Sequence, residues 1–155
     1  MHIITYVKGD ARSPIAIPAI IAHVCNNKGG WGAGFTKALT GKFGPSLKEF
    51  YQGMIRNDAN LGNTFIQHAN DNIFICHMIA QNGFRNAQNP VPLDYDSLDI
   101  CLGKLYRVCR ILHKNMTIHM PRIGCGLAGG TWDRVEPLIL KHMTVPTYVY
   151  DLTSN

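Results

Sequence analysis

Two glycine-dense segments carry the residues of this chain whose types and spacing could do chemistry. The first reads Cys-Asn-Asn-Lys-Gly-Gly-Trp-Gly-Ala-Gly over residues 25–34, and the second reads Pro-Arg-Ile-Gly-Cys-Gly-Leu-Ala-Gly-Gly over residues 121–130. Glycine lets the backbone turn tightly and bring its N–H groups close to a ligand, so both segments suit an anion such as phosphate. Two such loops indicate a ligand with two phosphates, or one phosphate held from both sides.

Each glycine loop lies between a short apolar run and a helical pattern. Residues 20–24 and 117–120 read as strands, while residues 35–43 and 131–141 read as helices. The start of a helix carries partial positive charge, which adds to the attraction for an anion. The sequence therefore predicts two strand–loop–helix units that could bind phosphate.

The remaining pattern predicts a single α/β domain over residues 1–155. Apolar residues recur every three to four positions through residues 98–112, which is typical of a helix. Alternating strands and helices favour a three-layer α/β/α sandwich with a mixed central sheet. In such sheets ligands bind at the carboxyl ends of strands, where both glycine loops fall. The further predicted elements are strands at 3–7, 64–68, 73–79 and 147–152, a helix at 45–53, and an irregular polar loop at 81–92.

The amino-acid composition limits the classes of ligand and partner that fit this chain. The net charge of +5 fits an anionic ligand, yet the basic residues are scattered singly, which argues against nucleic acid as a partner. Five cysteines without a C-x-x-C pair predict reduced thiols, a cytoplasmic location, and neither a metal site nor a cofactor. The longest apolar stretch, residues 15–24, is too short to span a membrane.

The order of four motifs resembles a macrodomain, the module that binds ADP-ribose and its derivatives. The resemblance covers nearly the whole chain and is strongest to the branch that contains the fungal ADP-ribose 1″-phosphate phosphatase and the terminal ADP-ribose glycohydrolase. It implies ADP-ribose or its 1″-phosphate as the small-molecule ligand, and ADP-ribosylated macromolecules as further partners. The matching motifs are Lys8-Gly9-Asp10 and residues 21–27, 29–35 and 120–127.

The resemblance also implies roles for particular residues. The acidic residue that Asp10 matches accepts hydrogen bonds from the adenine amino group, and the asparagine that Asn26 matches contacts the distal ribose. The two glycine loops together wrap the diphosphate and the distal ribose. The ligand-binding residues implied in this way are Gly9, Asp10, Ala22, Asn26, Gly29, Gly30, Trp31, Gly32, Ala33, Gly34, Ile123, Gly124, Cys125, Gly126 and Leu127.

Two hydrolytic mechanisms of the family lack their residues here. The terminal glycohydrolase uses a lysine after the fourth strand and an aspartate after Gly-Cys-Gly-Leu, but residues 80–85 contain no lysine and Ala128 occupies the aspartate position. The deacetylase-type branch carries an acidic residue in the first glycine loop, and residues 28–34 contain none. Both mechanisms are therefore disfavoured for this chain.

The candidate catalytic residues for phosphatase chemistry are present in this chain, namely His23, Asn26 and Asn27. A histidine that is neutral near pH 7 can activate water or protonate a leaving oxygen, and glycine N–H groups can stabilise phosphoryl charge. The sequence thus predicts slow removal of the 1″-phosphate from ADP-ribose 1″-phosphate. Three alternatives remain open: His23 as a core histidine, the chain as a non-catalytic ADP-ribose reader, or a hydrolase that removes ADP-ribose from modified protein or nucleic acid. Trp31 is expected to cover the bound ligand, with anchoring of its loop to the helices as the alternative, and Phe84 and Arg85 are candidates to flank the distal ribose.

Overall fold

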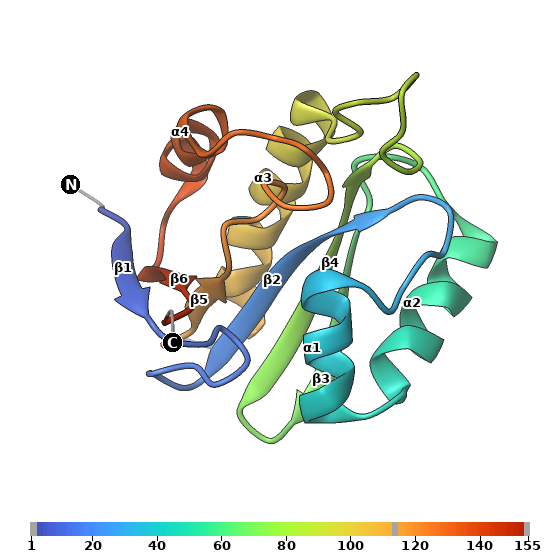
Figure 1. The fold of residues 1–155 in the computed structure, drawn as a ribbon. Coiled ribbons are helices and arrows are strands. Elements are labelled where there is room, and N and C mark those ends of the chain that lie inside the picture. The colour runs from blue at the N-terminus through green and yellow to red at the C-terminus, as the bar shows by residue number, and fades with distance from the viewer. Residues whose placement is uncertain (1–2, 113–114, 154–155) are drawn as a thin grey trace.

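A six-stranded mixed sheet forms the middle layer of the molecule, with strand order β1-β6-β5-β2-β4-β3 (Figure 1). This computed structural model describes residues 3–112 and 115–153. The edge strand β3 pairs antiparallel with β4, and the other neighbouring strands pair in parallel. The elements are β1 (Thr5–Lys8), β2 (Ala19–Asn26), α1 (Gly34–Phe43), α2 (Ser46–Asn57), β3 (Thr64–Asn70), β4 (Ile73–Gln81), α3 (Tyr95–Leu112), β5 (Thr117–Met120), α4 (Trp132–His142) and β6 (Thr147–Asp151).

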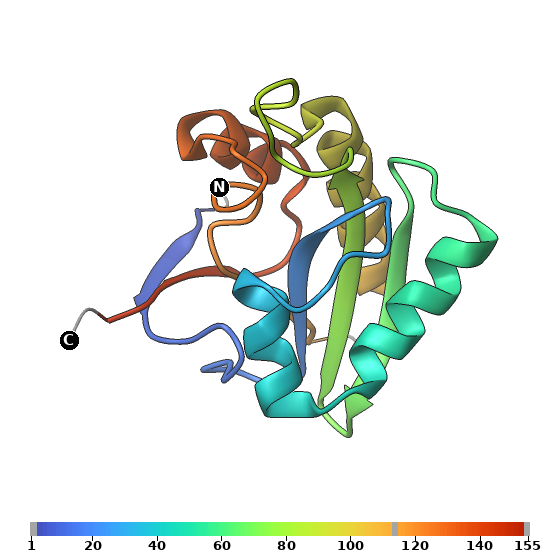
Figure 2. The same ribbon diagram turned by 45° about the vertical axis from the view of Figure 1, so that its right-hand side comes forward.

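Helices cover both faces of the sheet, as the sequence predicts. Successive side chains of β2 point to opposite faces: Ile21 packs with Leu39 of α1 and Leu47 of α2, whereas Ile20 packs in the cluster that contains Leu98 of α3. Figures 1 and 2 show α1 and α2 on one side of the sheet and α3 and α4 on the other. A strand buried on both faces must be apolar along nearly its whole length, which explains the composition of β2. The predicted α/β/α sandwich is confirmed.

The predicted elements are present with shifted ends. The first strand is Thr5–Lys8 where residues 3–7 were expected, and β2 extends one residue earlier and two later than residues 20–24. Helix α2 continues beyond Gly53 because Ile55 still packs against the buried cluster around Tyr51. Thr131 occupies the N-cap position of α4, as expected, but its side chain makes no capping hydrogen bond.

The neighbouring parallel strands β2 and β5 are followed by connections that leave toward opposite faces of the sheet. After β2 the chain enters α1 on one face, and after β5 it enters α4 on the opposite face (Figures 1 and 2). Loops that leave adjacent parallel strands toward opposite faces open a crevice at the carboxyl ends of those strands. Both glycine loops begin there. Within the described ranges, none of the helices has the length and apolar character needed to cross a bilayer.

Candidate functional site

One cavity of about 710 Å³ lies between the two glycine loops. This volume is within the range of about 300–1,000 Å³ that is usual for small-molecule sites. None of its described lining residues is an aspartate, a glutamate or a lysine, and its charged side chains are two arginines. The cavity is thus suited to an anion. Its lining residues are His23, Val24, Cys25, Asn26, Gly30, Trp31, Ala33, Gly34, Phe35, Thr36, Gln81, Phe84, Arg85, Pro121, Arg122, Ile123, Gly124, Gly126, Leu127 and Ala128.

Asn26, the last residue of β2, organises the first glycine loop. Its Oδ1 accepts hydrogen bonds from the backbone N–H groups of Lys28 and Gly30, both at 2.9 Å. Its Nδ2 donates to the Gly30 carbonyl at 3.0 Å, and the Tyr51 hydroxyl donates to the Asn26 carbonyl at 2.5 Å. Most of the hydrogen-bonding capacity of this amide is therefore used within the protein, where it holds the loop in shape.

Trp31 both lines the cavity and anchors the loop to the helices. Its Nε1–H donates to the hydroxyl of Thr40 in α1 at 2.8 Å. Its ring lies 5.5 Å from the ring of Tyr51 in α2 and 5.7 Å from that of His23. Because its polar end is already bonded within the protein, the indole is fixed against α1 and α2. The anchoring interpretation therefore describes its contacts better than a freely moving cover.

The second glycine loop packs tightly against the segment before α3. A Cβ atom on Gly130 would lie 2.4 Å from Leu93 Cδ2 and 2.7 Å from the Gly124 carbonyl oxygen. Gly124 itself has φ of +73°, a conformation that favours glycine. The Gly130 N–H donates to that same Gly124 carbonyl at 2.8 Å, which closes the loop on itself. Here glycine is required by close packing as well as by backbone conformation.

The irregular loop predicted over residues 81–92 begins one residue later, because Gln81 is the last residue of β4, and its residues Phe84 and Arg85 form part of the cavity. Asn27 accepts a hydrogen bond from the Gly83 N–H at 2.9 Å and donates to Asn82 at 3.1 Å, which ties this segment to the first glycine loop. Phe84 lies directly over Gly30, where a Cβ atom would approach its ring to 2.6 Å. The segment thus closes one side of the cavity with Phe84 and Arg85.

The two arginines of the cavity differ in their availability. Arg122 donates to both carboxylate oxygens of Asp151, at 2.7 and 3.0 Å, so its charge is already balanced. Arg85 is exposed, and among the described residues it has no hydrogen-bond or ion-pair partner. Arg85 is therefore the cation of this cavity that can pair with a bound anion.

His23 lies in the wall of the cavity, with only 2% of its surface exposed. Its Nε2 is 2.8 Å from Nδ1 of His77, and burial lowers its pKa to about 3. A low pKa makes the imidazole neutral at pH 7 but also a weak base. The catalytic role of His23 remains a prediction, and this geometry is equally that of a core histidine.

Asp10 lies outside the residues that line the cavity. Arg12 donates to its carboxylate through Nε at 2.8 Å and through the backbone N–H at 2.9 Å, and the side-chain hydrogen bond is the largest cause of the lowered pKa of Asp10. An adenine amino group would have to share this carboxylate with Arg12.

The predicted ligand-binding and catalytic residues divide into two groups. Those at the cavity are His23, Asn26, Gly30, Trp31, Ala33, Gly34, Ile123, Gly124, Gly126 and Leu127. Those outside its lining are Gly9, Asp10, Ala22, Asn27, Gly29, Gly32 and Cys125. Ala22 is fully buried because alternate β2 side chains point to the α3 and α4 face. Gln81 and Arg122 also line the cavity and were not predicted as site residues. Phe84 and Arg85, which were expected beside the distal ribose, line the cavity, and their contact with the ribose stays a prediction. Gln81 could have been found from its position at the carboxyl end of the strand beside β2.

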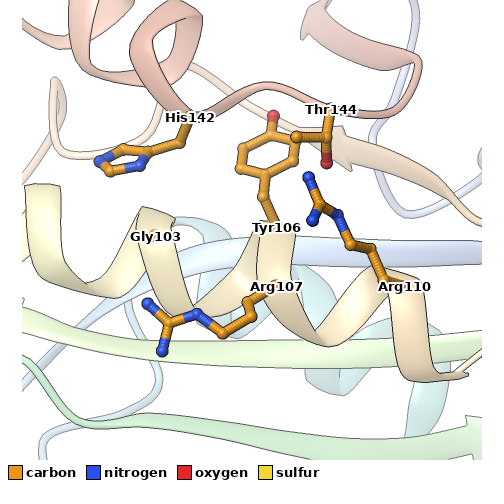
Figure 3. Close-up of a pocket in the computed structure, with 6 residues that line it drawn as sticks. All are labelled: Gly103, Tyr106, Arg107, Arg110, His142 and Thr144. Atoms are coloured by element: carbon orange, nitrogen blue, oxygen red, sulfur yellow. The ribbon is translucent and has the colours of Figure 1, made fainter.

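A smaller cavity of about 160 Å³ lies between α3 and the end of α4, where His142 and Thr144 line it (Figure 3). Arg110 points toward Thr144 there, whereas Arg107 points away from it. This volume is below the range usual for nucleotide-sized ligands. The cavity between the glycine loops is therefore the candidate functional site.

The sequence profile described as Macro domain matches residues 22–139, which include both glycine loops. This chain belongs to the Macro domain family. A macrodomain protein from Streptomyces coelicolor is 36% identical, with a TM-score of 0.81 over 96% of this chain and 98% of that one. A crystal structure of a protein from Bacteroides thetaiotaomicron has a TM-score of 0.87 at 35% identity, over 96% and 99% of the two chains. The ADP-ribose 1″-phosphate phosphatase of Candida albicans is 29% identical, over 95% of this macrodomain and 98% of that protein.

Proposed function

We propose that this macrodomain binds ADP-ribose in the cavity between its glycine loops and removes the 1″-phosphate from ADP-ribose 1″-phosphate. The observation that carries the proposal is the meeting of two loops, each rich in backbone N–H groups, at one cavity of about 710 Å³. Main-chain amides at such positions bind a diphosphate without lysine. The name of the Candida albicans relative supports the 1″-phosphate as the group removed.

The terminal phosphate would be held by Arg85 and by loop amides. Arg85 offers a guanidinium without a partner among the described residues, and charge-assisted hydrogen bonds to phosphate are the strong ones. Amides aimed at the phosphoryl oxygens would stabilise the charge that develops during hydrolysis. In this proposal His23 activates water or protonates the leaving oxygen from the cavity wall, and Asn26 holds the first glycine loop in shape. Asn27 joins residues 82–92 to that loop.

A second candidate function is a non-catalytic reader of ADP-ribose. It is favoured by one observation: the described residues that line the cavity include neither a carboxylate nor a lysine that could act as general acid or base. A reader would bind ADP-ribose and its 1″-phosphate but release no inorganic phosphate.

Two measurements on the same preparation test these functions. Calorimetry with ADP-ribose measures binding, with AMP and ribose 5-phosphate as partial ligands. Phosphate release from ADP-ribose 1″-phosphate at stoichiometric protein measures catalysis. We expect both to be positive. Binding without phosphate release would leave the reader function, and the absence of binding would overturn both.

His23→Ala separates catalysis from packing. If His23 acts on the reacting phosphate, the variant loses phosphate release by about 10²- to 10⁴-fold and keeps most of its affinity for ADP-ribose. Equal losses of both would assign His23 a structural role.

A further inference from the structure

Three metal-ligating side chains meet beneath the first glycine loop, on the face of the sheet that α1 and α2 cover. His23 of β2 lies opposite His77 of β4 in the parallel register, and Cys25 lies two residues further along the same face of β2. All three are buried, with exposures of 2% for His23, 3% for Cys25 and 0% for His77. His23 Nε2 is 2.8 Å from His77 Nδ1, while Cys25 Sγ is 3.6 Å from His23 Nε2 and 4.0 Å from His77 Nδ1.

A fourth residue, Gln67, sets the tautomer of His77. Its Nε2 donates to the carbonyl of Ser46 at 3.2 Å, so its Oε1 is the atom that lies 3.0 Å from His77 Nε2. That oxygen can only accept, so His77 carries its proton on Nε2 and directs the lone pair of Nδ1 toward His23. Histidine ligands of metals are usually held in this way, by a hydrogen bond from the other ring nitrogen to an oxygen.

The distances approach those of a tetrahedral zinc site. With Zn–N of about 2.1 Å and Zn–S of about 2.3 Å, two ligating nitrogens are about 3.4 Å apart, and a nitrogen and a sulfur are about 3.6 Å apart. The observed sulfur–nitrogen distances of 3.6 and 4.0 Å need little change. The nitrogen–nitrogen distance of 2.8 Å must widen by about 0.6 Å, which requires the two imidazoles to move apart when the ion binds.

We propose that His23, Cys25 and His77 bind one borderline or soft transition-metal ion of the Zn²⁺ class, with Gln67 as the positioning residue. Nitrogen and sulfur donors select such ions over Mg²⁺ or Ca²⁺, which prefer oxygen. The sequence predicts no metal site because no two of these residues have a typical local spacing. The parallel pairing of β2 and β4, which are 54 residues apart at His23 and His77, brings them together.

Binding releases one proton for each ion. In the metal-free network His77 Nδ1 accepts from His23 Nε2–H, and the Cys25 thiol lies 3.6 Å from His23 Nδ1. When the ion enters, the Nε2 proton of His23 leaves, the thiol proton passes to His23 Nδ1, and the thiolate and both imidazole lone pairs bind the metal. Both histidines stay neutral, and the ion and its ligands together carry one positive charge.

The site is also accessible to an ion. His23 and Cys25 form part of the cavity wall, so an ion can enter from the cavity. Three protein ligands leave one position of a tetrahedral ion open, as in catalytic zinc sites.

The test uses the full chain after treatment with a chelator. Zn²⁺ affinity is measured by competition with a chromophoric chelator, proton release by a pH indicator, and thiolate ligation by the charge-transfer absorption of the Co²⁺ form. We expect one ion and one released proton per chain, with a thiolate-to-cobalt band. A folded wild-type chain that takes up no Zn²⁺, or Co²⁺ uptake without that band, would overturn the proposal.

Matched variants identify the ligands. We expect Cys25→Ala and His77→Gln to weaken Zn²⁺ binding by more than about tenfold, while Cys109→Ala and His119→Gln, at other buried positions, keep the wild-type affinity. Gln67→Ala, at a partly exposed position, should lower affinity by about tenfold to a hundredfold without a change in stoichiometry. Equal affinity in Cys25→Ala and Cys109→Ala would overturn the assignment. Thermal unfolding shows which variants are folded, and the wild-type measurements stand independently of them.

Discussion

Asn26 and Gly30 are joined by two hydrogen bonds that run in opposite directions. The Gly30 N–H donates to Asn26 Oδ1 at 2.9 Å, and Asn26 Nδ2 donates to the Gly30 carbonyl at 3.0 Å. One side chain thus substitutes for a backbone partner across four residues and fixes the loop that faces the cavity. A fixed loop binds its ligand without a large loss of conformational entropy, because its amides are already oriented.

Asn26→Ala should therefore weaken ADP-ribose binding by about 1–3 kcal/mol, since the loop amides lose their support and a buried hydrogen-bond network is broken. Calorimetry measures the change. Asn70→Ala, which removes an exposed side chain that accepts from the Asn72 N–H in the turn between β3 and β4, is the control and should bind as wild type does. Equal affinity of the two variants would contradict the role of Asn26.

Asp10→Ala tests the predicted adenine contact. If the carboxylate accepts the adenine amino group, the variant should lose about 1–3 kcal/mol of ADP-ribose affinity but bind ribose 5-phosphate, which has no adenine, as wild type does. Arg12→Ala frees the carboxylate from its present partner and should not weaken the binding of ADP-ribose. If Asp10→Ala leaves the dissociation constant unchanged, Asp10 acts only as the partner of Arg12.

Arg85→Ala should discriminate between the two ligands of the proposed reaction. Loss of a charge-assisted hydrogen bond to the terminal phosphate should weaken the binding of ADP-ribose 1″-phosphate by about 1.5–3 kcal/mol. The binding of ADP-ribose should weaken by less. Arg107→Ala changes the net charge equally and lies at the smaller cavity, so it controls for long-range electrostatics. The same loss in both variants would show that overall charge, rather than Arg85, attracts the ligand.

Gly130→Ala should destabilise the fold by about 1–3 kcal/mol, because its Cβ atom would overlap both Leu93 and the backbone oxygen of Gly124. Gly126→Ala is the matched control: no atom lies within 4 Å of its Cβ position, and its φ is not positive. Chemical denaturation of both variants measures the difference. Similar stabilities would mean that the second loop moves aside at little cost.

His119 should make stability depend on pH. Thr117 Oγ1 donates to the Pro18 carbonyl and so accepts from His119 Nε2–H, and His119 Nδ1 accepts from the Tyr150 hydroxyl. Burial lowers the pKa of His119 to about 4, whereas an unfolded histidine titrates near its ordinary value of 6.5. Below that value the unfolded state binds a proton that the folded state does not, so stability falls as the pH falls.

Between pH 7 and pH 5 this group should cost on the order of 2 kcal/mol of unfolding free energy. His119→Gln removes the titrating group, so the loss over this interval should be smaller by about that amount than in wild type. Urea denaturation at the two pH values measures both slopes. Parallel slopes would show that His119 does not contribute.

Much of the fold could be predicted from local sequence patterns. The apolar run of β2, the helical period of α3 and the glycine content of both loops depend on neighbours within a few residues, because strands, helices and turns each impose their own short spacing. The order of these elements was enough to predict the α/β/α sandwich and the meeting of the two loops at one edge of the sheet.

The tertiary structure decided what depends on distant partners. Phe84 lies over Gly30, Asp151 pairs with Arg122 and leaves Arg85 as the available cation, and the register of β2 against β4 sets His77 beside His23. Such contacts follow from packing and strand register over tens of residues, and the spacing of residue types along the chain does not encode those distances.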